Sequence, residues 1–328
     1  MKRRALLLSV GAALLARPAL GQPNVQKRVG YLTSQSEDDP TTVLYRSAVL
    51  KGLSARGWEL GRDLEVDLRY GNLEPARIEA GARELVAEAP DALFGTTTPP
   101  TAALKKLTST IPIVFGNVSD PIGSGFVKSF ARPGTNVTGC SNYEDSVAGK
   151  WLEFLLRVAP GAHTVGLMFN PKTAPGAGDF YWKPFESIAR ASGIDPVRVP
   201  VESVEEIDSE MARLAQVPSS ALVVASDIYM YGNRERVAAA AAANHLPAMY
   251  PYTEYAQAGG LISYAIDLED TFFRAGQLLG RILDGENPAD LPVQGPTRFI
   301  TTINLATARA QGITVPPDLL ATADEVIE

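Results

Sequence analysis

Polar, charged and tyrosine side chains follow the predicted strands of this chain, each within a few residues of a strand end. In open α/β sheets, ligands bind at the carboxyl ends of the strands. The segments 117–121 and 141–143 are the first candidates, because they follow the apolar runs 111–115 and 136–141. The predicted ligand-binding residues are Ser34, Gln35, Thr97, Thr98, Asn117, Ser119, Asp120, Asn142, Tyr143, Asn170, Asp227, Tyr229, Tyr252 and Glu254.

These hydroxyls, amides, carboxylates and aromatic rings suit a small zwitterion or another polar organic ligand. An ammonium group needs an acidic partner, for which Asp227 and Glu254 are the candidates. A ligand carboxylate can be bound by free N–H groups at helix starts and by the hydroxyls of Ser34, Thr97, Thr98 and Ser119. An aromatic body would stack against Tyr143, Tyr229, Tyr231, Tyr250 or Tyr252.

Each of these assignments has a structural alternative. Ser34 and Thr97 could instead cap helices, as short hydroxyl side chains often do. Asp120, which precedes a proline, could cap its own turn. Glu254 could instead serve only to stabilise the start of a helix, where the helix dipole favours acidic side chains. The tyrosines could instead serve mainly in packing within the folded chain.

Short apolar runs alternate with amphipathic segments of helical period along the whole chain. The predicted strands are 28–33, 64–70, 91–95, 111–115 and 136–141, then 164–169, 197–201, 221–225, 247–250, 260–266 and 297–303. Strand–helix alternation of this kind indicates right-handed βαβ units and parallel sheets. Because the pattern restarts after Tyr143, we predict an α/β fold with two doubly wound parallel-sheet lobes.

Length and composition restrict the class of protein further. A chain of 328 residues is too long for one small domain and suits two lobes. Its 45% apolar and 20% charged residues are typical of a globular protein. The net charge is −7, and subtracting the four basic residues of segment 1–21 gives −11. An acidic chain without clustered Lys and Arg is not expected to bind nucleic acid.

Residues 1–21 have the layout of a secretory signal peptide. A positive start, Lys2–Arg4, precedes a short apolar core and small residues, so Gln22 is the predicted new N-terminus. The apolar core is too short and too interrupted to span a bilayer comfortably, and Arg3-Arg4 leaves both the general and the twin-arginine export routes open. Cys140 is the single cysteine and is expected to be a buried apolar residue without a disulfide.

The motifs expected of common enzymes are absent from the sequence. His163 and His245 have no metal-ligand spacing with another His, Cys or acid. The segment Gly123-Ser124-Gly125 does not match a nucleophile elbow. No phosphate-binding or dinucleotide-binding glycine motif occurs. We therefore expect a protein that is not an enzyme and that uses neither a metal nor a cofactor.

The segment SDPIGSGFVKSFARPGTNVTG, at 119–139, resembles the family of ABC transporter substrate-binding proteins whose better-known members bind aromatic amino acids. The C-terminal segment 259–328 is similar to the same family over its whole length. The resemblance implies a periplasmic binding protein type I-like fold with three interlobe crossovers. Lobe one would comprise 28–142 plus 258–288, and lobe two 143–257 plus 289–328.

The same resemblance implies a function. The protein would be the periplasmic solute-binding component of an ABC importer and would capture a small solute by closure of its lobes. The predicted solute is an aromatic amino acid or a related compound. It would deliver that solute to an inner-membrane permease driven by a cytoplasmic ATPase, and would act as a monomer because closure needs both lobe faces free. The alternatives are a ligand sensor for a membrane receptor and a secreted enzyme using cleft carboxylates such as Asp120 and Asp227.

Overall fold

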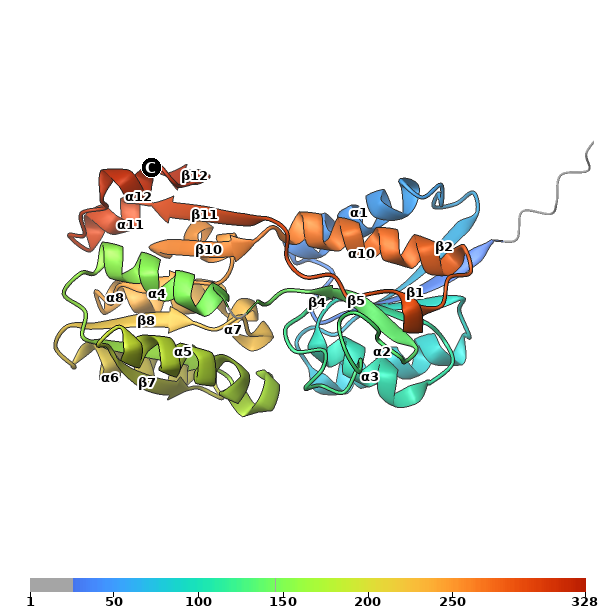
Figure 1. Ribbon diagram of the computed structural model, residues 1–328, viewed down its shortest axis with the longest axis horizontal. Coiled ribbons are helices and arrows are strands. Elements are labelled where there is room, and N and C mark those ends of the chain that lie inside the picture. Colours follow the sequence, from blue (N-terminus) through green and yellow to red (C-terminus); the bar gives the residue numbers. More distant parts are fainter. Residues whose placement is uncertain (1–25, 145) are drawn as a thin grey trace, which may run out of the picture.

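The computed structural model describes residues 26–144 and 146–328, which form two α/β lobes side by side along the long axis of the molecule (Figure 1). The predicted signal peptide, 1–21, lies outside the described residues. Each lobe is built on its own open sheet, with helices on both faces. This arrangement confirms the predicted two-lobed, doubly wound α/β fold.

Lobe one contains a five-stranded sheet in the order β2-β1-β3-β4-β5, in which all strands are parallel. The strands are β1 (Lys27–Thr33), β2 (Leu64–Tyr70), β3 (Ala92–Gly95), β4 (Ile113–Val118) and β5 (Val137–Ser141). Strands β3 and β5 are buried along their whole length, as expected for parallel strands covered on both faces. Cys140 in β5 is buried and free, as predicted.

Four helices cover the sheet of lobe one. Two pack on each face, with α1 and α10 lying side by side and α2 and α3 on the opposite face (Figure 1). Their bounds are α1 (Pro40–Ser54), α2 (Pro75–Ala87), α3 (Thr98–Leu107) and α10 (Leu268–Leu283). A short 3₁₀ segment, Pro288–Asp290, follows α10. Helices α1, α2 and α3 follow β1, β2 and β3, so they begin at the carboxyl edge of the sheet, which faces the other lobe.

Lobe two contains a seven-stranded sheet in the order β12-β11-β10-β9-β8-β6-β7. Strand β11 runs antiparallel to β10, and all other pairs are parallel. The strands are β6 (Thr164–Phe169), β7 (Asp195–Pro200), β8 (Ser220–Val224), β9 (Ala248–Tyr250), β10 (Ile262–Ile266), β11 (Phe299–Asn304) and β12 (Glu325–Ile327).

The helices of lobe two are α4 (Ser146–Val158), α5 (Asp179–Ala191), α6 (Val204–Ala215), α7 (Ile228–Gly232), α8 (Arg234–Ala243), α9 (Thr253–Gln257), α11 (Leu305–Ala310) and α12 (Pro317–Leu320), with a 3₁₀ turn at Pro175–Gly178. Within the described parts of the chain, no helix combines the length and apolar character needed to cross a membrane.

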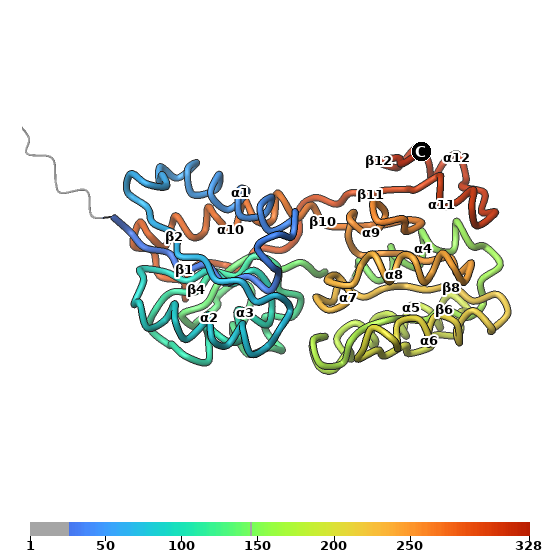
Figure 2. The backbone as a smooth tube through the Cα atoms, turned by 180° about the vertical axis from the view of Figure 1, so that it is seen from behind, coloured from blue at the N-terminus to red at the C-terminus, as the bar shows by residue number. Residues whose placement is uncertain are grey.

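The chain passes between the lobes three times, as predicted. It leaves lobe one after β5, returns from β10 into α10, and leaves again before β11 (Figures 1 and 2). The sheets divide the chain differently from the predicted ranges at two places. Strand β10 pairs in the sheet of lobe two, although 258–288 was expected in lobe one. Gln294 bridges to Cys140 in β5, so 289–294 stays with lobe one.

Helices α1 and α10 cross so closely that two glycines are required at the contact. A Cβ atom added to Gly276 would lie 2.2 Å from the carbonyl oxygen of Val49, and one on Gly52 would lie 2.1 Å from that of Phe273. Both obstacles are backbone atoms, so no side-chain movement can make room. A larger residue at either position would therefore force the two helices apart.

Replacing Gly276 with alanine is expected to lower the free energy of unfolding by about 1–3 kcal/mol, because the added methyl overpacks this helix contact. Urea-induced unfolding followed by circular dichroism would measure the change. Gly149→Ala is the matched control, because its Cβ would meet only the Ile188 Cδ1 atom, at 3.7 Å. Equal stability of the two variants would contradict the expected crowding.

Candidate functional site

Two adjoining cavities lie between the lobes. The first, here called the polar chamber, has a volume of about 20 Å³, and the second, the apolar pocket, about 300 Å³. They share three lining residues, Pro99, Thr173 and Ile228, and therefore lie next to each other. The polar chamber is lined by Thr97, Thr98, Pro99, Asn117, Ser119, Asn142, Thr173, Pro175, Tyr181, Ser226, Asp227, Ile228 and Tyr252.

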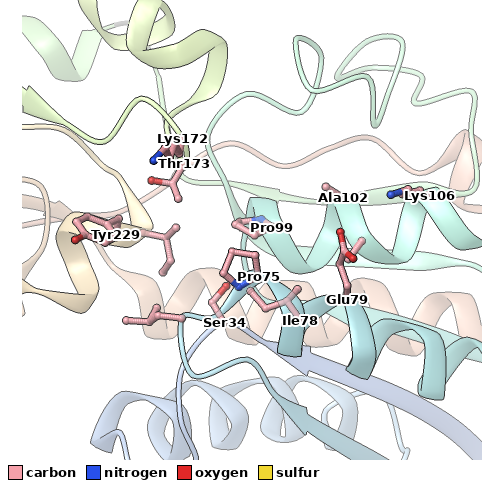
Figure 3. A pocket seen from close by; sticks show the side chains of 13 residues that line it. Ser34, Pro75, Ile78, Glu79, Pro99, Ala102, Lys106, Lys172, Thr173 and Tyr229 are labelled. Atoms are coloured by element: carbon pink, nitrogen blue, oxygen red, sulfur yellow. The ribbon is translucent and has the colours of Figure 1, made fainter. Parts of the chain in front are cut away.

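The apolar pocket has one wall from each lobe. In Figure 3, Pro75, Ile78 and Pro99 of lobe one lie opposite Thr173 and Tyr229 of lobe two. Its lining is mostly aliphatic, with a few charged side chains and the hydroxyl of Ser34. Its volume lies at the lower end of the range of small-molecule sites, about 300–1,000 Å³. The full lining is Ser34, Leu73, Pro75, Ile78, Glu79, Pro99, Ala102, Ala103, Lys106, Lys172, Thr173, Ile228 and Tyr229.

Asp227 is the carboxylate of the polar chamber. It follows β8 and caps α7, accepting a 3.0 Å hydrogen bond from the backbone N–H of Met230. Its second oxygen accepts a 2.6 Å bond from the hydroxyl of Thr173. The residue is 2% exposed, and burial raises its pKa to about 6. No ion pair to Asp227 is formed by the residues that the structure describes, so its charge is not compensated there.

Two amide oxygens add acceptors to this chamber. The side-chain N–H₂ group of Asn142 donates to the hydroxyls of Tyr252, at 3.2 Å, and Ser226, at 3.4 Å. Asn117 lies beside the same Tyr252 hydroxyl. The Oδ1 atoms of Asn117 and Asn142 are both buried, and neither has a hydrogen-bond partner among the described residues. Unpartnered buried acceptors are costly, so both atoms call for an N–H or O–H donor.

The bond between Ser119 and Tyr181 also crosses from one lobe to the other. The Tyr181 hydroxyl lies 2.6 Å from the carbonyl oxygen of Ser226 and 2.7 Å from the Ser119 hydroxyl. A carbonyl can only accept, and Tyr181 has a single hydroxyl hydrogen, so Ser119 must donate to Tyr181. Ser119 was predicted to donate to a ligand carboxylate; here it keeps only its lone pairs for the chamber.

Hydrogen-bond donors gather on the lobe-one side. The hydroxyls of Ser34 and Thr97 lie 2.7 Å apart, so one donates to the other and a single hydrogen is left over. Asp39, not Ser34, caps α1, and Thr97 occupies the N-cap position of α3 but its side chain makes no capping hydrogen bond. Neither side chain therefore makes the capping hydrogen bond that the alternative expected. The pair can donate one hydrogen bond towards the cleft.

The start of α3 offers fewer backbone donors than a typical helix. Pro99 and Pro100 occupy its second and third positions and have no N–H group. The N–H of Thr101 already bonds to the Thr97 carbonyl, at 3.1 Å. Thr98 therefore contributes the one N–H group of this turn that is left for a ligand, together with its hydroxyl. Of the free backbone N–H groups predicted at this helix start, one therefore remains, that of Thr98.

The structure brings seven of the fourteen predicted residues together in the polar chamber: Thr97, Thr98, Asn117, Ser119, Asn142, Asp227 and Tyr252. Ser34 and Tyr229 line the adjoining apolar pocket. Asp120 and Tyr143 line a separate hollow beside the crossovers, and the Asp120 carboxylate accepts from the Gly123 N–H at 2.7 Å. For Asp120 the turn-capping alternative thus describes the observed contact.

Three further predicted residues have their polar groups engaged elsewhere. Glu254 accepts a hydrogen bond from the Tyr45 hydroxyl across the lobes and lines a different pocket. Asn170 accepts from the N–H of Lys172 at 2.7 Å. Gln35 accepts from the Thr33 hydroxyl at 2.7 Å. None of the three lines the chamber or the apolar pocket, which leaves Asp227 as the candidate partner for an ammonium group.

Several lining residues were not predicted. Ser226 directly precedes Asp227 and also follows the predicted strand 221–225, so the same rule could have identified it. Thr173 lies in a loop rich in Gly, Pro and Ala, and Tyr181 lies on a buried face of α5. Burial raises the pKa of the Tyr181 hydroxyl well above its usual value, so it remains protonated. For metals, no cluster of three or more potential ligands is found in the described part of the chain.

Two lobes joined by three crossovers, with a polar chamber and an apolar pocket between them, define a two-lobed binding protein of the periplasmic binding protein type I-like class. A family model described as "ABC transporter substrate binding protein" matches residues 34–327. The chain therefore belongs to this family of substrate-binding proteins, which are not enzymes.

Similar proteins are found by sequence and by structure. A tyrosine-binding protein of Clostridioides difficile is 25% identical over 285 residues, covering 87% of this chain and 81% of that protein. An ABC domain from Streptococcus pneumonia in complex with L-Trp has a TM-score of 0.85 and 25% identity, covering 92% of this chain and all of that one. A conserved domain protein from Vibrio cholerae also has a TM-score of 0.85, with 28% identity and 92% and 99% coverage.

Proposed function

We propose that this protein is the exported solute-binding component of an ABC importer and that it captures an aromatic L-amino acid between its lobes. The observation that carries the proposal is the pairing of two environments at one place: a buried, acceptor-rich chamber lies next to an apolar pocket and shares three lining residues with it. An amino acid with a large ring has the matching division into a charged end and an apolar end. The L-Trp complex and the tyrosine-binding relative support the same ligand class.

The ligand ammonium group would lie in the polar chamber. It has three N–H donors, and the chamber offers the Asp227 carboxylate and the unpartnered oxygens of Asn117 and Asn142. Binding would therefore satisfy two buried acceptors and supply the missing charge partner of Asp227. The ligand carboxylate would accept from the spare Ser34–Thr97 hydrogen and from Thr98.

The ring would occupy the apolar pocket between the Pro75–Ile78 wall and Tyr229 (Figure 3). Because the acceptors and the ring walls come from both lobes, a bound ligand stabilises the closed arrangement more than the open one. The chamber of about 20 Å³ is too small to admit a ligand in the closed arrangement, so entry requires the lobes to part. Closure would then present the loaded form to a membrane permease driven by a cytoplasmic ATPase.

A thermal-shift screen tests the ligand class. The protein without residues 1–21 would be unfolded and refolded to remove bound solutes, and then tested against amino acids, aromatic acids, sugars and short peptides. A ligand at a hundredfold excess over its Kd adds about 2.7 kcal/mol to the free energy of unfolding. We expect L-tryptophan, L-tyrosine or L-phenylalanine to raise the melting temperature. A shift with another class alone would refute the proposed ligand.

Transport itself needs a test in cells. Deleting the gene is expected to reduce uptake of the radiolabelled ligand, and expressing the intact chain is expected to restore it. A ligand sensor, the alternative role, would leave uptake intact while a ligand-dependent response was lost. Fractionation of the periplasm would check the proposed location, with the processed N-terminus read by mass spectrometry against the predicted start at Gln22.

A further inference from the structure

The turn between β2 and α2 holds Leu73 at the edge of the apolar pocket in an unfavourable backbone conformation. Asn72 and Leu73 both have positive φ angles, of 52° and 59°. Two successive residues with side chains rarely adopt this left-handed region, and such strain concentrates at ligand-binding positions. The turn is fixed by hydrogen bonds from Leu73 N to the Ser34 carbonyl, at 2.7 Å, and from Glu74 N to the Gly71 carbonyl, at 2.9 Å.

This conformation presents a large apolar side chain to the gap between the lobes. Leu73 is 38% exposed and lines the apolar pocket with Ile228 and Tyr229 of lobe two. It belongs to lobe one, so its contact with lobe two exists only while the lobes are close together. A strained turn that exposes a leucine lowers the stability of the fold, which indicates a role outside folding.

Leu73 meets a glycine on the other lobe. A Cβ atom added to Gly232, the last residue of α7, would lie 2.2 Å from the Leu73 Cδ1 atom. Gly232 is not among the glycines with a positive φ, so its backbone could be adopted by any residue. The absence of a side chain at position 232 is therefore explained by the space that Leu73 needs. The two residues fit together as a contact between the lobes.

We propose that Leu73 is a gate of the apolar pocket that also limits the size of the bound ring, and that Gly232 provides the space into which it closes. This inference rests on the proposed function and adds to it the residues that select among aromatic amino acids. When the lobes close, Leu73 covers the ring from the lobe-one side while Ile228 and Tyr229 line the other. A smaller residue at position 73 leaves more room, and any side chain at position 232 holds the gate open.

Isothermal titration of Gly232→Ala with L-tryptophan, L-tyrosine and L-phenylalanine tests the gate. We expect affinity to fall about tenfold or more, because the added methyl collides with Leu73 on closure. We expect the thermal stability of the ligand-free protein to be unchanged or higher, because alanine is the better helix former and the lobes can remain apart when no ligand is bound. Gly149→Ala, at a helical glycine whose added Cβ would make only an ordinary contact, is the control and should leave affinity unchanged.

The variant Leu73→Ala tests whether the effect of Gly232→Ala depends on the side chain at position 73. We expect this variant to bind less tightly and to favour tryptophan over phenylalanine more than the wild type does. In the Leu73→Ala background, adding Gly232→Ala should change affinity less than twofold, because the colliding side chain is gone. A tenfold loss in both backgrounds, or no loss in either, would overturn the gate.

A second measurement tests the proposed gate independently of which ligand the protein binds. Spin labels at Leu107→Cys and Val217→Cys, exposed positions in different lobes, report the distance between the lobes while the buried Cys140 stays unlabelled. Gly232→Ala should shift the distances to longer values, except when position 73 is alanine. Identical distances in all variants would overturn the gate. A wild type that binds none of the three amino acids would overturn the proposed function, with the distances still testing the gate.

Discussion

Replacing Asp227 with asparagine is expected to weaken the binding of an aromatic L-amino acid on the order of a hundredfold. Among the described residues, Asp227 is the one carboxylate that lines the polar chamber, and it is nearly fully buried. Without its charge, the ligand ammonium group would be desolvated next to neutral acceptors alone. Removing one partner of a buried, hydrogen-bonded charge pair costs about 2–5 kcal/mol, which is why a large loss is expected.

The fold should tolerate this change. The side-chain oxygen of the introduced asparagine would still accept from the Met230 N–H, and its amide could donate to the Thr173 hydroxyl, so the cap of α7 is kept. Asp208→Asn is a matched control, because Asp208 is exposed and pairs with Arg236 away from the cleft. Titration calorimetry would give both affinities, and melting curves would confirm folding. Binding by Asp227→Asn within threefold of the wild type would contradict the ammonium role.

The fold and half of the predicted site residues follow from one rule that can be applied to the sequence. Parallel strands end at a common edge, so residues after different strands must meet even when they are far apart in the chain. Asn117, Asn142 and Asp227 lie at or just after the ends of β4, β5 and β8, and all three line the polar chamber. The lobes themselves were predictable because apolar runs and helical segments alternate in two successive halves.

The same rule does not specify which way a side chain points or what it bonds to. Glu254 follows β9 in the same manner as Asp227 follows β8, yet it accepts a bond from Tyr45 in a different pocket. Asn170 and Asp120 also follow strands, and both bond to N–H groups of their own turns. These outcomes depend on local backbone geometry, which polarity and spacing do not encode.

The apolar half of the site was not visible in the sequence for a different reason. Leu73, Pro75, Ile78 and Ile228 come from a turn and from helix starts, and apolar residues there usually pack within their own lobe. They form a pocket only because the two lobes approach one another. The strand β10 shows a similar limit. Its apolar pattern predicts a strand, whereas its pairing with β9 and β11 depends on where the crossover lies.

Acidification should weaken ligand binding before it destabilises the protein. Burial raises the pKa of Asp227 to about 6, so below that pH the carboxyl becomes protonated and loses its charge. The ligand carboxylate stays ionised, because α-carboxyl groups titrate near pH 3.5. Affinity for an aromatic L-amino acid is therefore expected to be constant above about pH 7 and to fall about tenfold for each pH unit below 6.

The effect of the same group on folding has the opposite sign. An unfolded aspartate titrates near pH 3.9, so between pH 4 and 6 the folded protein holds more protons at Asp227 than the unfolded chain does. Its contribution to the free energy of unfolding therefore rises as the pH falls from 7 to 4. Carboxyls whose pKa is lowered by ion pairs, such as Asp179 beside Arg198 and Asp208 beside Arg236, keep their stabilising effect above the ordinary aspartate pKa and lose it progressively as the pH falls from there through their lowered pKa.

Calorimetric titrations from pH 7.5 to 5, together with melting curves of the ligand-free protein, separate these two effects. We expect affinity to fall across this range. Protonation of Asp227 is not expected to lower the melting temperature. The residual binding of Asp227→Asn should show no such pH dependence, because the titrating carboxyl has been removed. A constant wild-type Kd between pH 7 and 5 would contradict a contact between the ammonium group and an Asp227 that titrates near pH 6. If Asp227→Asn also bound normally, the acceptor oxygens of Asn117 and Asn142 would have to bind the ammonium group without a charged partner.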